Sequence, residues 1–162
     1  MIDWEKVKYY NPERDQFSEN PDEHAEPELI YTLDKFRSMV KIPLRPSRID
    51  GSLARFEGHE QSRHYAIDRL SDAIKVCPDG SLRKTWLVAI CSGLWGGVGL
   101  YPYLKNQGIS EPTLHLDLRP VAEGNSHRYT IIWFKDIDGE HYFPQFEKRA
   151  EGRLFNILNS IG

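Results

Sequence analysis

Residues 113–119 constrain the fold most, because apolar and polar side chains alternate strictly along them. One set of alternate positions holds Leu114, Leu116 and Leu118, and the other holds His115, Asp117 and Arg119. Successive side chains of a β-strand point to opposite faces of the sheet. The pattern therefore predicts a strand with a leucine face against the core and a polar face that can carry chemistry.

The rest of the chain predicts a mixture of helices and strands. Apolar residues recur at three- and four-residue steps over 28–39, which predicts an amphipathic helix. A second helix is predicted over 81–91, capped by Ser81 or Asp79, and a short third one over 155–161. Further strands are predicted at 40–44, 70–76, 97–101 and 129–134. We expect an α+β fold, in which two or three helices pack on one face of a small, mainly antiparallel sheet.

Length and composition indicate one globular domain. The chain has 162 residues, of which 40% are hydrophobic and 28% charged, which is ordinary for a domain with its own core. Residues 1–27 contain three prolines and few aliphatic side chains, so we expect an extended N-terminal arm there. Residues 28–162 are expected to form the single domain.

Charge and hydropathy argue against several classes of partner. The net charge of -3 gives no electrostatic basis for binding nucleic acid, which needs a clustered basic face. No apolar run approaches the roughly 20 residues that span a bilayer. The N-terminus has no basic start and no apolar segment, so we expect synthesis in the cytoplasm without a signal peptide. The sequence does not indicate an oligomeric state.

Two clusters of polar residues predict a metal site. Ser62 and His64 are followed by Asp72, and His115 is followed two residues later by Asp117. Two imidazoles and a carboxylate are the three protein ligands that a catalytic zinc needs, with a water in the fourth position. The alternatives are a solvated strand face and ordinary loop histidines, and we interpret His59 as one of the latter.

These residues resemble the motif of a known family. The segment Ser62-Arg63-His64, the later Asp72-Ala73-Ile74 and the segment His115-Leu116-Asp117 are similar to the zinc peptidases that include D-alanyl-D-alanine carboxypeptidases, dipeptidases and phage endolysins. That family shares its fold with the hedgehog signalling domain. The resemblance covers roughly residues 28–145. It implies a hedgehog-like peptidase fold and zinc-dependent hydrolysis of a peptide bond in bacterial cell-wall peptide.

The resemblance also implies a role for each site residue. His64, Asp72 and His115 would bind zinc, and Ser62 would orient the first ligand loop. Asp117 would accept the proton that the zinc-bound water gives up. An arginine in the loop after the first strand would stabilise the oxyanion, and Arg48 or Arg45 could supply it.

The motif is matched only in part. The family places its aspartate seven residues after the first histidine, whereas Asp72 follows His64 by eight, and the family's intervening glycine and alanine are absent. If the family's Ala-x-Asp corresponds to Ala73-Ile74-Lys75, a lysine replaces the ligand, and Asp68 is a third candidate. The alternative function is a catalytically inactive, metal-free binding or structural module, such as a phage virion component. A cell-wall enzyme without a signal peptide would be phage-encoded and released by lysis, or carried in the virion.

Overall fold

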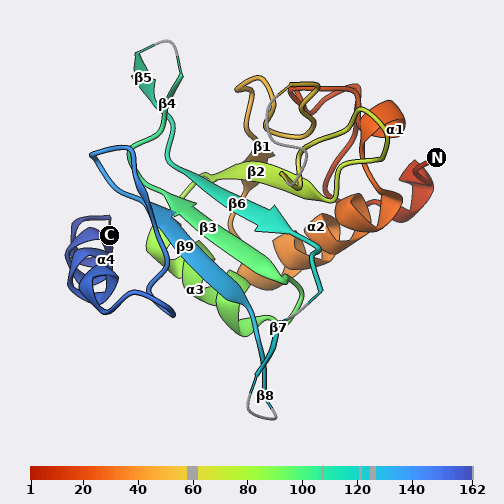
Figure 1. The fold of residues 1–162 in the computed structure, drawn as a ribbon. Helices are drawn as coiled ribbons and strands as arrows, with labels where there is room; N and C mark the ends of the chain where they lie inside the picture. Colours follow the sequence, from red (N-terminus) through yellow and green to blue (C-terminus); the bar gives the residue numbers. More distant parts are fainter. Residues whose placement is uncertain (58–61, 107, 121, 125–126, 162) are drawn as a thin grey trace.

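A six-stranded sheet with the strand order β1-β2-β6-β3-β9-β10 organises the chain (Figure 1). The computed structural model describes residues 1–57, 62–106, 108–120, 122–124 and 127–161. The strands are β1 (Leu44–Pro46), β2 (Ala73–Pro78), β3 (Gly97–Tyr101), β6 (Thr113–Asp117), β9 (Ile131–Lys135) and β10 (His141–Tyr142). Neighbouring strands are antiparallel except for β3 and β9, which are parallel. The predicted α+β class with a mainly antiparallel sheet is confirmed.

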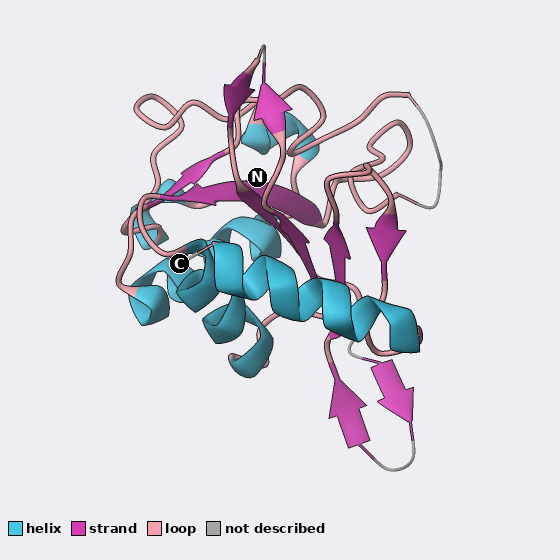
Figure 2. Cartoon of the chain, turned by 90° about the vertical axis from the view of Figure 1, so that its left-hand side faces the viewer, coloured by secondary structure: helices cyan, strands magenta, loops and turns pink. Residues whose placement is uncertain are grey.

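Two small hairpins extend from opposite ends of this sheet (Figures 1 and 2). One pairs β4 (Lys105–Asn106) with β5 (Ile109–Ser110). The other pairs β7 (Ala122–Gly124) with β8 (His127–Tyr129). Neither hairpin is predicted from the sequence, because strands of two or three residues are too short to show an alternating pattern.

The two longest predicted helices are confirmed and pack behind the sheet (Figure 1). The first is α2 (Pro27–Val40), whose buried side chains follow the predicted apolar periodicity. The second is α3 (Leu82–Cys91), and the Ser81 side chain caps it by accepting a hydrogen bond from the Lys84 amide. The C-terminal helix α4 (Lys148–Ser160) begins seven residues earlier than predicted. No helix of the described part is long and apolar enough to cross a membrane.

The N-terminal 27 residues pack closely against the domain. They contain a short 3-10 helix (Trp4–Lys6) and α1 (Pro21–His24). The side chains of Ile2, Val7 and Tyr10 are buried in the hydrophobic core. The arm therefore contributes to the core as well as to the surface.

Two predicted strands have different boundaries in the structure. The segment predicted as a strand at 40–44 forms instead the end of α2 and the turn after it, because Lys41 closes the helix in the left-handed conformation, with φ 56°. β1 begins only at Leu44. β2 begins at Ala73, three residues later than predicted, because Ser71 forms a bridge with Ala25 of the N-terminal segment.

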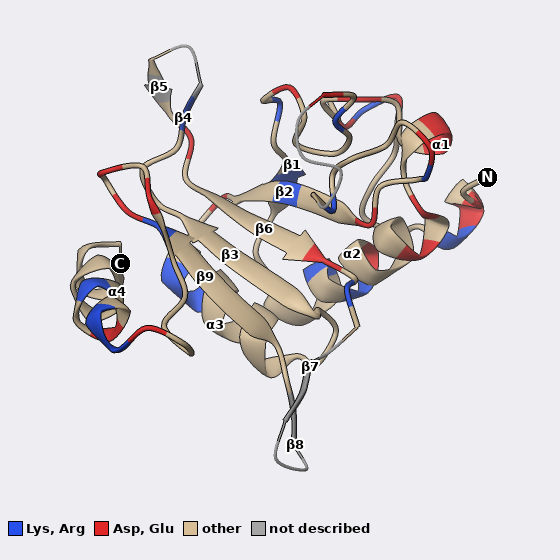
Figure 3. Ribbon diagram, in the orientation of Figure 1, with Lys and Arg blue, Asp and Glu red and all other residues tan. Residues whose placement is uncertain are grey.

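The two faces of the sheet differ as the alternation in 113–119 predicts. Leu114 and Leu116 of β6 are fully buried in the core that the helices cover. Figure 3 shows most charged residues on helices and loops, with charged segments also on β2 and β6. Those two are Lys75 and Asp117. The register places them on the sheet face that points away from α2 and α3.

Candidate functional site

The register of the sheet brings distant polar residues into one row. Lys75 of β2 lies directly opposite His115 of β6, and His115 lies opposite Gly99 of β3. Gly99 in turn lies beside Trp133 of β9. Residues opposite each other in neighbouring strands project to the same face. This row, together with Asp117 one step along β6, forms the centre of the candidate site.

A loop carries His64 to this row. Its Nε2 atom lies 2.9 Å from Nδ1 of His115, and its Nδ1 lies 3.3 Å from the Leu53 carbonyl oxygen. The Ser62 hydroxyl accepts a hydrogen bond from the His64 amide at 3.3 Å. The backbone of this loop is also held, because the His64 carbonyl accepts a hydrogen bond from the Arg55 amide. The structure thus brings His64 and His115 together although 51 residues separate them.

Glu19 fixes a second loop, residues 51–54, which faces His64. Its carboxylate accepts hydrogen bonds from the amides of Gly51, Leu53 and Ala54 at 2.6 to 3.0 Å. The Leu53 carbonyl that contacts His64 is therefore held by the N-terminal segment. No pattern in the sequence indicates this role of Glu19.

Asp117 anchors the other end of the imidazole pair. Its Oδ2 lies 2.9 Å from Nε2 of His115. The Arg119 guanidinium donates to both carboxylate oxygens, at 2.7 and 2.6 Å. Asp117 is fully buried, so this two-point ion pair compensates for the loss of hydration. With both oxygens occupied, the carboxylate is placed to orient His115.

Two glycines of β3 make room for these side chains. A Cβ at Gly97 would lie 2.5 Å from Oδ2 of Asp117, and one at Gly99 would lie 2.6 Å from the Trp133 indole. The Trp133 ring centroid lies 4.9 Å from that of His115, and Arg119 stacks over the indole at 5.0 Å. The glycine-rich strand therefore has a steric role beneath the site.

Burial determines the charges of the site. It lowers the pKa of His64 well below its usual value and also lowers that of His115, so both imidazoles are neutral near pH 7. Burial alone would raise the pKa of Asp117, but the hydrogen bonds from His115 and Arg119 outweigh it and keep the carboxylate ionised.

These charges leave two nitrogen lone pairs facing each other. The ionised Asp117 requires a proton on Nε2 of His115, and the Leu53 carbonyl requires one on Nδ1 of His64. In neutral rings the other nitrogens, 2.9 Å apart, then carry lone pairs. A shared cation, either a proton or a metal ion, would satisfy both.

Lys75 brings a second cation, besides Arg119, to this face. Its side chain is only 6% exposed, and its Nζ lies 5.7 Å from the centroid of the Tyr101 ring. Burial, followed by repulsion from Arg55 and Lys135, lowers the pKa of Lys75 to about 8. The Lys75 charge also contributes to the lowered pKa of His64 and of His115.

The structure does not bring Asp72 to the imidazoles. Asp72 precedes β2, and its Oδ2 accepts a hydrogen bond from Arg63 at 2.7 Å. An extended chain turns Asp72 and Lys75 to opposite sides. Of the two residues, Lys75 is the one in register with His115. The ligand set predicted from the sequence is thus reduced to His64 and His115.

Neither arginine proposed for the oxyanion is linked to the imidazole pair. Arg48 is exposed in the loop after β1. Arg45 donates to Glu111 at 2.6 Å and is engaged there. Arg119 and Arg55 are the arginines whose charges act on the site, through Asp117 and through His64. His59 lies outside the described residues.

The residues present make an incomplete ligand set for a catalytic zinc ion. Such an ion needs three protein ligands, and the site offers two imidazoles with a lysine on the third side. No group of three or more His, Cys, Asp and Glu side chains within the described ranges could hold a metal ion. A protonated lysine has no lone pair to donate and would repel a dication.

Of the site residues that were not predicted, Arg119 could have been found from the sequence, whereas Glu19 could not. Arg119 belongs to the alternating pattern of 113–119, so its place on the polar face was predictable. The contact of His64 with Leu53 and the position of Glu19 depend on loop conformation, which no periodicity reports.

Comparison of the chain with protein-family models, with curated proteins and with solved structures finds no match. The resemblance to the zinc peptidases therefore stays a prediction that depends on the motif residues alone.

Proposed function

We propose that this chain is a metal-free binding module that recognises bacterial cell-wall peptide without hydrolysing it. The position of Lys75 is the main support for the metal-free part of this proposal, and the cell-wall target comes from the resemblance of the motif residues. Lys75 lies opposite His115, where a zinc peptidase would need its third ligand, while Asp72 is paired with Arg63. A phage particle, or a phage lysis system, would bring such a module to the cell wall.

The burial of the site also argues against hydrolysis. His64 is 2% exposed and His115 6% exposed, and Asp117 is not exposed at all. A hydrolytic group must reach the scissile bond within about 3 Å. With its polar atoms enclosed and bonded to one another, the cluster instead acts as a structural link between the loop that carries His64 and the sheet.

A zinc-dependent hydrolase of cell-wall peptide is the second candidate, and the two facing lone pairs favour it. The outer nitrogens of His64 and His115 are each held by an acceptor, the Leu53 carbonyl and Asp117. That arrangement is typical of imidazoles that bind zinc. In such an enzyme Asp117 would orient His115, since Arg119 already occupies both of its oxygens.

Incubation with purified peptidoglycan distinguishes the two candidates. The protein is mixed with sacculi, with added zinc or with a chelator, and both co-sedimentation and soluble fragments are measured. We expect the protein to sediment with the sacculi and to release no fragments under either condition.

Fragment release that a chelator abolishes would overturn the proposal in favour of the hydrolase. In that case His115→Ala would lose the release, and the control His24→Ala, in α1 and outside the polar row, would keep it. Failure to sediment with sacculi would also overturn the proposal, because the target would then be wrong.

A further inference from the structure

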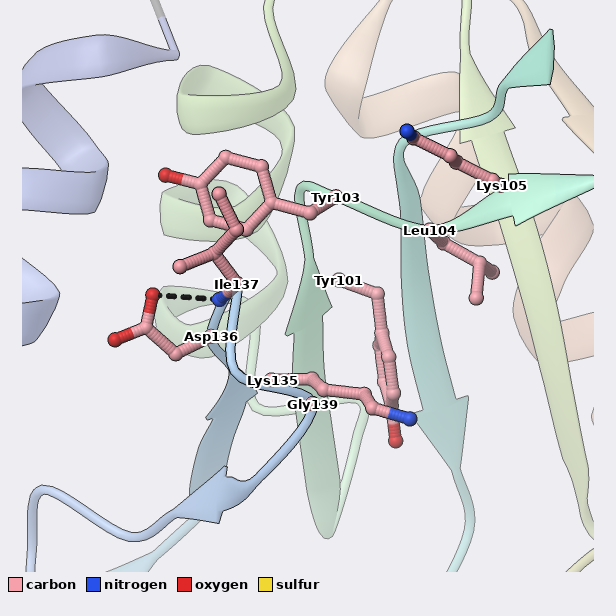
Figure 4. A pocket seen from close by; sticks show the side chains of 8 residues that line it. All are labelled: Tyr101, Tyr103, Leu104, Lys105, Lys135, Asp136, Ile137 and Gly139. Carbon is pink, nitrogen blue, oxygen red and sulfur yellow. Dashed lines mark hydrogen bonds between the residues drawn. The ribbon is translucent and has the colours of Figure 1, made fainter. Parts of the chain in front are cut away.

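A separate pocket lies between the end of β3 and the turn after β9 (Figure 4). Its volume is about 140 Å³, several times the roughly 30 Å³ that one water occupies in the liquid. Tyr101 and Tyr103 line it from the end of β3, Lys105 from β4, and Lys135 and Ile137 from β9 and its turn. It can therefore hold a small organic group.

The pocket has an uncompensated positive charge. Figure 4 shows Lys105 and Lys135 at opposite ends of the lining. Within the described residues neither ammonium forms an ion pair. Asp136 is the acidic lining residue, and both of its oxygens are occupied: Oδ1 accepts from the Ile137 amide at 2.7 Å and Oδ2 from Arg153 at 2.8 Å.

Lys75 adds to this positive potential from the adjoining row. Its ammonium lies over the Tyr101 ring, and repulsion from Lys135 contributes to the lowered pKa of Lys75. An anion in the pocket would relieve this repulsion among the lysines. The charge therefore selects a negatively charged ligand.

The walls add a requirement for apolar surface. Ile137 is 80% exposed and Tyr103 39% exposed, and both belong to the lining. Figure 4 shows their side chains lying together on one side of the pocket, with Leu104 on the other. An apolar group seated between them would cover surface that now faces water.

From this combination we propose that the pocket binds a carboxylate attached to an apolar body, such as the C-terminal residue of a peptide. Lys105 and Lys135 attract the carboxylate from the two ends of the lining, and Tyr103, Leu104 and Ile137 contact the apolar part. A carboxylate suits the lining better than inorganic phosphate, because phosphate has no apolar part to contact Tyr103, Leu104 and Ile137. The site does not involve the imidazole pair and is independent of the function proposed above.

Titration of isotope-labelled protein with N-acetyl-leucine, followed by the amide NMR signals of the lining residues, tests this site. We expect saturable shifts with the acid and none with N-acetyl-leucinamide, which lacks only the charge. Lys105→Gln and Lys135→Gln should each weaken binding about fivefold, as expected for an ion pair of roughly 1 kcal/mol. The control Lys84→Gln, on α3 behind the sheet, should bind like the wild type.

Several results would overturn the carboxylate site. Equal shifts with N-acetyl-leucine and N-acetyl-leucinamide would show that the pocket does not recognise the negative charge. Inorganic phosphate that binds more tightly than the acid would indicate a phosphate site instead. Absence of saturable shifts, or loss of affinity in Lys84→Gln equal to that in Lys135→Gln, would rule out the pocket as the binding site.

Discussion

At the scale of single residues, the buried charge of Lys75 has an energetic cost that depends on pH. Its pKa of about 8 arises first from burial and then from Arg55 and Lys135. Below pH 8 the folded and the unfolded chain both carry the ammonium, so the folded state bears the whole cost of burying it. For a pKa lowered from 10.5 to about 8 that cost is about 3 kcal/mol.

The cost should disappear at alkaline pH. Between pH 8 and 10.5 the folded protein releases the Lys75 proton while the unfolded chain keeps it, so the free energy of unfolding rises with pH. Lys75→Met should therefore be more stable than the wild type at pH 7, and this advantage should shrink by about 2 kcal/mol by pH 9.5. Urea denaturation of both proteins at the two pH values measures the change. If the stability difference between Lys75→Met and the wild type were independent of pH, the buried charge of Lys75 would not be its cause. For the control Lys84→Met we expect a difference from the wild type that is the same at both pH values.

At the scale of elements, local periodicity explains what could be predicted. The helices α2 and α3 and the strands β3 and β6 follow from spacing within a few residues, so their positions agree with the sequence analysis. The pairing of Lys75 with His115 joins residues 40 positions apart, and no local pattern specifies it. No local pattern predicts that the polar face is buried either. Its burial depends on the loop of His64 and on the loop that Glu19 holds.

The strand β3 shows how closely an element can be fitted to its neighbours. A Cβ at Gly99 would lie 2.6 Å from two atoms of the Trp133 indole, so Gly99→Ala must displace that ring and its contact with His115. We expect a loss of roughly 1–3 kcal/mol in the free energy of unfolding, measured by urea denaturation.

Helix α4 offers the matched control for this substitution. A Cβ at Gly152 would meet no atom within 4 Å, so Gly152→Ala should instead stabilise the protein, by roughly 0.5–1 kcal/mol. Equal effects of the two substitutions would argue against a steric role for Gly99.

At the scale of the whole molecule, the sheet separates two environments. The helices α2 and α3 cover an apolar face, and the loops and the N-terminal segment enclose a polar face. A series of hydrogen-bonded groups crosses the polar face, and it consists of Leu53, His64, His115, Asp117 and Arg119. The charged pocket at the end of β3 borders that polar face through Tyr101. The proposal of binding without hydrolysis rests on this arrangement.

Calorimetric titration with zinc tests the central claim most directly, because it reports the donor set itself. We expect no stoichiometric binding by the wild type. Lys75→Asp should bind one equivalent, since a carboxylate would then join the two imidazoles, and Lys84→Asp should behave like the wild type. One equivalent of zinc bound by the wild type with micromolar affinity or better, and lost in His64→Ala, would contradict the account.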